Sequence, residues 1–252
     1  MDVNEGVYPF CIIQTNTDPD FGFTKWEGEN IKLYPIRYKE IVMIVADVPK
    51  KDYLPTRANV LAHQSVISIV MKEFTVIPMS FNNVFSTQRE IHLLLEKLYD
   101  ELQSIFQKIN NKIEVGLKVI AKKEWLEEEI RKNDDIQKLK EKVSQQKEAA
   151  FYEKIQLGEK TKDFFYALRH NLYKAIYSPL STISNASKSN PPIYETMLLN
   201  AAFLIDCEKE EIFDEKVNEL YEIWKDKVDF KYSGPWPAYN FIQLNITAGE
   251  RP

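Results

Sequence analysis

Apolar residues in the first third of the chain fall into short, nearly continuous runs separated by polar segments. Such runs are typical of strands that are covered on both faces of a sheet. The predicted strands are residues 7–14, 31–36, 40–45 and 74–78. Residues 15–30 are polar and rich in aspartate, and we expect a loop or short irregular pieces there.

Two helices are predicted between and after these strands. Thr56 is the candidate N-cap of the first, and the apolar positions expected to face the core follow it at helical spacing. They are Ala58, Leu61, Ala62, Ser65, Val66, Ile69 and Val70. The second helix begins after Ser86 or Thr87, where Glu90 completes a capping box, and is expected to run to Ile109.

A change of pattern near residue 112 predicts a second domain. Residues 113–121 alternate as a half-exposed strand does. Residues 122–154 are mostly charged, without Gly or Pro, and predict two helices with a bend at 133–135. The second helix regains an apolar stripe and is expected to end before Pro179, so part of this segment would project as a thin helical arm.

The remaining patterns complete the second domain. We expect strands at residues 180–184 and 195–206, a loop at 185–192, a helix at 209–227 and a last strand at 239–246. From residue 113 the order is strand, helices, strand, strand, helix, strand, which is the ferredoxin-like pattern. The prediction is an α+β chain with an N-terminal α/β domain (1–111) and a ferredoxin-like domain (112–252) whose helical arm covers about 122–178.

Composition narrows the class of protein. The net charge of −5 and the lack of a basic stripe argue against a nucleic-acid binder. No apolar run approaches 18 residues and no secretory signal is visible, so we expect a cytoplasmic protein without membrane insertion. Cys11 and Cys207 lie in apolar runs and are expected to be buried thiols.

The ionisable residues form no recognisable catalytic or metal-binding motif. His63, His92 and His170 all fall on predicted helices, and none is paired at the spacing of a zinc helix. Asp47 follows a strong strand, where an α/β enzyme can place an acid, although a turn or capping role is the simpler hypothesis. We therefore predict no catalytic residue, cofactor or metal.

Aromatic residues offer the candidate partner-binding positions. Trp236 lies in a stiff corner, because Pro235 and Pro237 fix the backbone around it and restrict the residues before them. With Tyr239, Phe241 and Trp125 it forms our candidate set, since tryptophan is favoured at interface hot spots. A packing role for Trp236 and a solvated surface for the charged arm are the alternatives.

Several strings in the chain resemble the GvpF/GvpL family of gas vesicle accessory proteins. They are residues 45–49 (VADVP), 75–85 (TVIPMSFNNVF), 114–119 (EVGLKV), 199–205 (LNAAFLI) and 233–241 (SGPWPAYNF). The matches keep their order and span about residues 7–246, and the last is the most specific. Ser80, Asn82 and Ala238 depart from the family's Arg, Gly and Pro, which leaves the F-type or L-type assignment open.

The resemblance implies a non-enzymatic assembly factor in the cytoplasm, associated with the gas vesicle. It would bind the hydrophobic shell protein, other accessory proteins or both during nucleation and assembly, and be a monomer in isolation. It also implies two α/β domains, the second ferredoxin-like. The alternative is a small-ligand sensor or enzyme on a ferredoxin-like scaffold, which would need a pocket with convergent polar groups.

Overall fold

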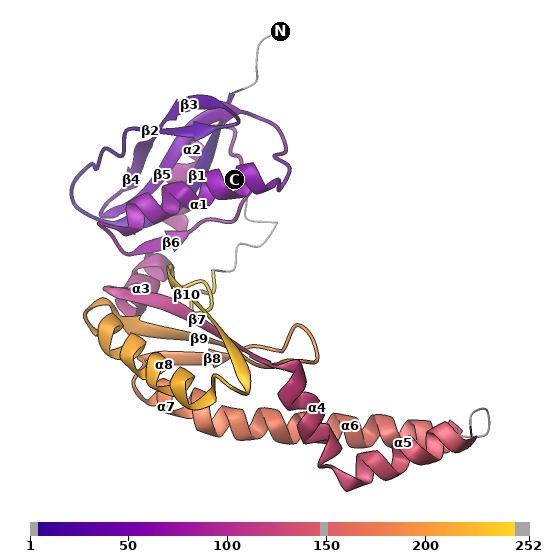
Figure 1. The fold of residues 1–252 in the computed structure, drawn as a ribbon. Coiled ribbons are helices and arrows are strands. Elements are labelled where there is room, and N and C mark those ends of the chain that lie inside the picture. The colour runs from indigo at the N-terminus through magenta and orange to yellow at the C-terminus, as the bar shows by residue number, and fades with distance from the viewer. Residues whose placement is uncertain (1–4, 147–150, 245–252) are drawn as a thin grey trace. The chain divides into compact units, whose positions relative to one another are not determined.

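The computed structural model describes residues 5–146 and 151–244 (Figure 1). The described residues form two compact units, one of residues 5–113 and 236–244 and the other of residues 114–146 and 151–235. Each unit contains a four-stranded sheet and helices. The mixed α/β fold expected from the sequence is therefore confirmed.

The sheet of unit 1 has the strand order β4-β5-β1-β6. Its strands are β1 (Glu5–Gln14), β4 (Tyr34–Tyr38), β5 (Ile41–Pro49) and β6 (Val76–Pro78), and each neighbouring pair is antiparallel. The β1–β5 register shifts between Pro9 and Cys11. This bulge turns the adjacent side chains of Phe10 and Cys11 into the same core cluster.

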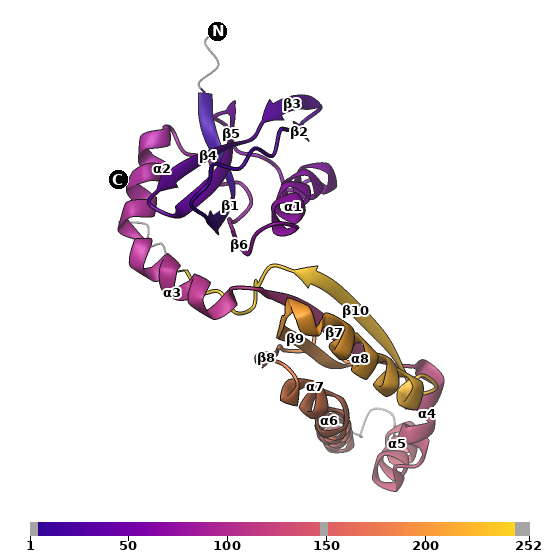
Figure 2. The ribbon, with the colours of Figure 1, turned by 90° about the vertical axis from the view of Figure 1, so that its left-hand side faces the viewer.

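Helices cover both faces of this sheet, with α1 (Arg57–Met71) on one side and α2 (Gln88–Lys97) on the other (Figure 2). The predicted caps are confirmed: the Thr56 side chain accepts from the Asn59 amide, and that of Thr87 from the Glu90 amide. The single helix expected to reach Ile109 is wrong, because the chain bends at Leu98 and continues as α3 (Tyr99–Ile109). The bend lets each helix bury its own apolar stripe.

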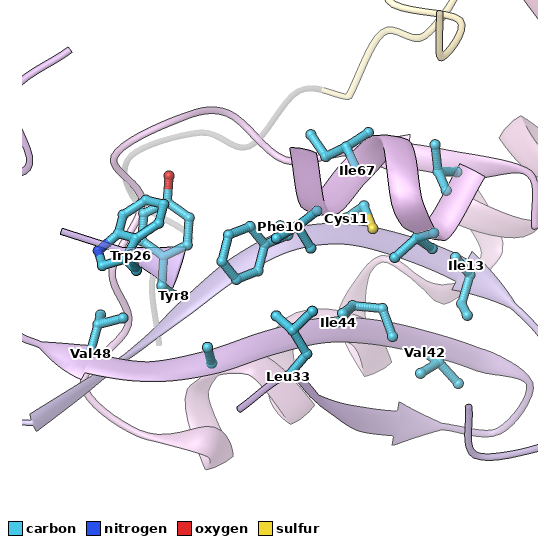
Figure 3. Close-up of a cluster of buried hydrophobic side chains, with 14 of the residues drawn as sticks. Tyr8, Phe10, Cys11, Ile13, Trp26, Leu33, Val42, Ile44, Val48 and Ile67 are labelled. Atoms are coloured by element: carbon cyan, nitrogen blue, oxygen red, sulfur yellow. The ribbon is translucent and has the colours of Figure 1, made fainter. Parts of the chain in front are cut away.

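The main core of unit 1 lies between β1, β5 and α1 (Figure 3). Helix α1 contributes Asn59, His63, Val66, Ile67 and Val70 to the buried side. The predicted stripe is wrong in part, because Leu61 is 52% and Ile69 38% exposed. The buried and the exposed face of α1 are both largely uncharged, so helical periodicity does not distinguish them. The predicted stripe therefore includes residues of both faces.

A hairpin replaces part of the loop expected at residues 15–30. Strands β2 (Phe23–Trp26) and β3 (Glu29–Lys32) pair antiparallel across Glu27 and Gly28, both of which have positive φ. That geometry suits a two-residue hairpin turn, and the Glu-Gly pair gives a weaker sequence signal than Asn-Gly. The hairpin places Trp26 in the core.

The sheet of unit 2 has the order β10-β7-β9-β8. Its strands are β7 (Lys112–Ala121), β8 (Ala186–Ser189), β9 (Met197–Asp206) and β10 (Val228–Trp236). The last strand was expected at residues 239–246, and this is wrong, because the strand comes before and includes the proline corner. Its place at the sheet edge explains this, since an edge strand tolerates Pro235 without losing a ladder hydrogen bond.

The arm consists of α4 (Lys123–Arg131), α5 (Asp134–Gln146) and α6 (Phe151–Leu172). The predicted bend is confirmed, with Asn133 Oδ1 accepting from the Ile136 amide at 3.1 Å. Helix α5 lies alongside the N-terminal half of α6 in both ribbon views, and Lys160 pairs with Asp135 (Figures 1 and 2).

The helix was predicted to end before Pro179, and this is wrong. It continues through a π-helical turn (Tyr173–Tyr177) into α7 (Ser178–Thr182), whose first turn contains Pro179. Helix α7 replaces the strand expected at 180–184, and β8 lies within the predicted loop 185–192.

One face of the unit 2 sheet carries both helical crossovers. The ring of Phe203 on β9 lies 5.5 Å from that of Tyr177 and 5.3 Å from that of Phe213, measured between centroids. Phe213 belongs to α8 (Glu210–Trp224), which follows a 3-10 turn (Cys207–Lys209). Cys207 is exposed, so the expectation that both cysteines are buried is wrong for it.

Candidate interaction surfaces

The proline corner combines a tight fit with exposed rings. Gly234 has a φ of +138°, its peptide bond to Pro235 is cis, and a Cβ at this position would lie 3.0 Å from the Glu114 carbonyl oxygen of β7. After Trp236 the chain enters a short turn in which the Phe241 amide donates to the Ala238 carbonyl at 3.0 Å. Residues 245–246 of the expected strand lie outside the described residues.

Two of the predicted partner-binding side chains in this segment are accessible. Trp236 is 38% and Tyr239 46% exposed, whereas Phe241 is only partly accessible and Ala238 is buried. Because the flanking residues are held by buried contacts and hydrogen bonds, the two rings are presented on an ordered backbone. A partner that contacts them therefore orders little additional chain.

Trp125 is not part of this segment. It lies on α4 in unit 2, beside the buried Leu126, and is itself half-buried. The structure therefore brings together three of the four candidate residues and leaves Trp125 on another element.

Asp47 and His63, the residues singled out for possible enzyme chemistry, lie on opposite faces of the unit 1 sheet. The buried neighbours of Asp47 along β5, Ala46 and Val48, point into the core whose Tyr8 and Phe10 rings contact His63. Asp47 is exposed and accepts a hydrogen bond from the Tyr34 hydroxyl at 2.5 Å. Burial and this contact raise the pKa of Tyr34. The two residues cannot act on one substrate.

His63 is a buried structural histidine. Its Nε2 is 3.1 Å from the Met79 carbonyl oxygen, which can only accept, so Nε2 carries the proton. Nδ1 then accepts from the Tyr8 hydroxyl at 3.1 Å, and that hydroxyl accepts from the Asn82 amide. Burial lowers the pKa of His63 and raises that of Tyr8 to about 12. The ring thus ties the segment after β6 to the core.

A cavity of about 300 Å³ lies in unit 2 between α7 and the start of α8. Its lining residues are Thr182, Ile183, Ser184, Asn185, Lys209, Ile212 and Phe213. The one ionisable group among them, Lys209, forms an ion pair with Asp206. Within residues 5–146 and 151–244, no group of three or more His, Cys, Asp or Glu side chains could hold a metal ion. No helix in these ranges is both long and apolar enough to cross a bilayer.

Helix α6 carries an apolar surface that the sequence patterns did not single out. Phe151, Tyr152, Ile155 and Tyr166 are between 46% and 75% exposed on it. The predicted stripe of this helix (Phe164, Phe165, Leu168, Leu172) lies on its other, partly buried side. The sequence signal that could have indicated this exposed surface is a second set of apolar residues at helical spacing along the same helix.

Comparison with known proteins gives consistent matches over nearly the whole chain. The family model described as "Gas vesicle synthesis protein GvpL/GvpF" matches residues 6–243. Gas vesicle protein F1 of Halobacterium salinarum is 25% identical over 99% of this chain and 98% of its own length. Gas vesicle protein F of Dolichospermum flosaquae is 27% identical over 95% of this chain and 96% of its own.

A solved structure shows the same fold. The crystal structure of the gas vesicle protein GvpF from Anabaena sp. PCC7120 matches with a TM-score of 0.82 and 22% identity. The match covers 96% of this chain and all of that one. The names of these relatives describe no enzymatic activity.

Proposed function

The chain belongs to the gas vesicle GvpL/GvpF family, and from this premise we propose that it is a non-enzymatic accessory protein for gas vesicle formation. It binds the hydrophobic shell protein, other accessory proteins or both during nucleation and assembly. It acts in the cytoplasm, in association with the forming vesicle.

The ordered, exposed pair Trp236 and Tyr239 is the observation that carries this proposal. A shell subunit with a large apolar surface must be held before it polymerises, and large rings on a fixed backbone suit that task. The half-buried Trp125 and the charged arm form a second candidate surface. The strand order of unit 2 and the packing of both crossovers on Phe203 support our inference that this unit is a ferredoxin-like scaffold.

The rival function, a small-ligand sensor or enzyme, receives less support. It would require convergent polar groups around a pocket. The unit 2 cavity holds a single ionisable side chain, already paired, and Asp47 and His63 face apart. Binding of a ligand at this cavity with loss on Phe213→Ala would favour the rival.

Capture of the shell protein tests the proposed surface. We expect Trp236→Ala to weaken pull-down of the shell protein by roughly 30-fold, the factor that corresponds to losing about 2 kcal/mol from a hot-spot ring. Tyr239→Ala is expected to act in the same direction. Tyr194→Ala is the matched control, because Tyr194 is also 46% exposed but lies outside the corner.

The role itself is tested by complementation. A vesicle-producing cell that lacks this chain should form few or no vesicles, and the wild-type chain should restore them. If a folded Trp236→Ala/Tyr239→Ala double variant captures the shell protein and restores vesicles as well as Tyr194→Ala does, the assignment of this surface is wrong. If deletion leaves vesicle formation unchanged, the proposed function is wrong.

A further inference from the structure

The outward face of α6 carries a line of residues that is complementary to itself. Phe151, Ile155, Glu159, Lys162, Tyr166 and His170 follow one another at steps of three or four, so they lie along one face of the helix. We call these six residues the α6 ridge. All six are exposed, with Phe151 at 75%, Ile155 at 46% and Tyr166 at 73%. The ridge lies away from the side that α5 and β9 cover, because the residues facing them are partly buried.

Two features of the ridge indicate that another helix covers it. Phe151, Ile155 and Tyr166 are three large exposed apolar residues on one helix face, and such a group marks an interaction site more often than isolated apolar residues do. Gly158 lies beside the ridge in mid-helix, with no atom within 4 Å of the position of a Cβ. Glycine weakens a helix interior by about 1 kcal/mol, but it permits close approach of a second backbone.

The order of residues points to a second copy of this chain as the occupant. Suppose that two α6 helices pack antiparallel about a twofold axis that passes between residues 160 and 161. Each residue then meets the residue of the other copy that lies equally far along the helix on the opposite side of the axis. Ile155 then meets Tyr166 of the other copy, Phe151 meets His170, and Glu159 meets Lys162. Every contact occurs twice, as a twofold interface requires.

The charges support this register. Glu159 and Lys162 are both exposed, and neither forms an ion pair with any residue that the structure describes. Antiparallel pairing places them opposite each other at the centre of an apolar contact, where two Glu–Lys pairs would form. A parallel pair would instead place Glu159 against Glu159, which is repulsive.

We propose that the chain forms an antiparallel homodimer through the α6 ridge. The proposal is independent of the Trp236 segment and of the proposed function, and it opposes the expectation of a monomer in isolation. Length is sufficient, since the ridge from Phe151 to His170 extends about 28 Å along the helix axis.

A charge exchange on the full chain tests the register. Sedimentation velocity over a concentration series should show reversible dimerisation of the wild type. Glu159→Lys and Lys162→Glu should each weaken it about tenfold or more, because each sets two like charges opposite each other. The double variant Glu159→Lys/Lys162→Glu should restore the wild-type constant, since the pairs re-form with reversed sign.

The controls separate the ridge from general charge effects. Glu211→Lys on α8 makes the same change in net charge at another exposed helix position and should leave dimerisation unchanged. Tyr166→Ala should weaken the dimer, whereas Ile223→Ala, at a residue 69% exposed on α8, should not. A wild-type chain that stays monomeric throughout the series overturns the proposal. So does a dimer that tolerates Glu159→Lys, is not rescued by the double variant, or responds equally to Glu211→Lys.

Discussion

Gly234→Ala is expected to lower the free energy of unfolding by about 2–4 kcal/mol, from the sum of a strained backbone and a close contact. The φ of +138° belongs to a region that residues with a Cβ rarely adopt. The new Cβ would also lie 3.0 Å from the Glu114 carbonyl oxygen and 3.2 Å from Val115 Cγ1. Two of its neighbours are backbone atoms of a central strand, so they cannot move aside cheaply. Denaturant unfolding followed by circular dichroism measures the loss.

Two other glycines calibrate this effect. Gly22 has a φ of +66° but no atom within 4 Å of a Cβ, so Gly22→Ala should cost only about 1 kcal/mol. Gly158 is helical and equally open, and Gly158→Ala should stabilise the isolated chain by up to about 1 kcal/mol. If Gly234→Ala is no more costly than Gly22→Ala, the fit of the corner against β7 is not as tight as the distances indicate.

The corner also shows what the sequence could not supply. The Ser-Gly-Pro-Trp-Pro string correctly predicts a stiff, extended backbone, because proline chemistry is local. Whether such a string begins or ends a strand depends on the neighbouring strands. Edge position makes β10 compatible with Pro235, and no local property of residues 228–236 encodes that position.

Helices α1 and α6 illustrate the same limit for packing. Each has apolar residues on two faces, so a helical period identifies the element but not the buried side. In α1 the buried side includes Asn59 and His63, which a hydrophobicity pattern excludes. In α6 the predicted stripe faces inward and the ridge faces outward. For the candidate site, the sequence identified the aromatic residues Trp236, Tyr239 and Phe241. Which of these rings are exposed, and that Trp125 lies on another element, could be determined only from the fold.

His63 is expected to make the protein less stable as the pH falls below about 6.5. The folded chain holds His63 neutral, and burial lowers its pKa, whereas the unfolded chain has an ordinary histidine pKa near 6.5. Below about pH 6.5 the unfolded state therefore binds more protons, and stability decreases by up to about 1.4 kcal/mol per pH unit until the folded state also protonates. Above that pH, His63 adds no pH dependence.

Substitution isolates this contribution. His63→Phe should remove it, so the stability difference between wild type and variant should shrink as the pH is lowered from 7.5 to about 5. At pH 7.5 the variant should be less stable by about 2–4 kcal/mol, because the Tyr8 hydroxyl and the Met79 carbonyl each lose a buried partner. His170→Phe, at an exposed position, should show neither effect. A difference that stays constant with pH would mean that His63 is protonated to the same extent in both states. That result would contradict the neutral His63 ring that the two hydrogen bonds indicate, the ring that connects the core to the segment after β6.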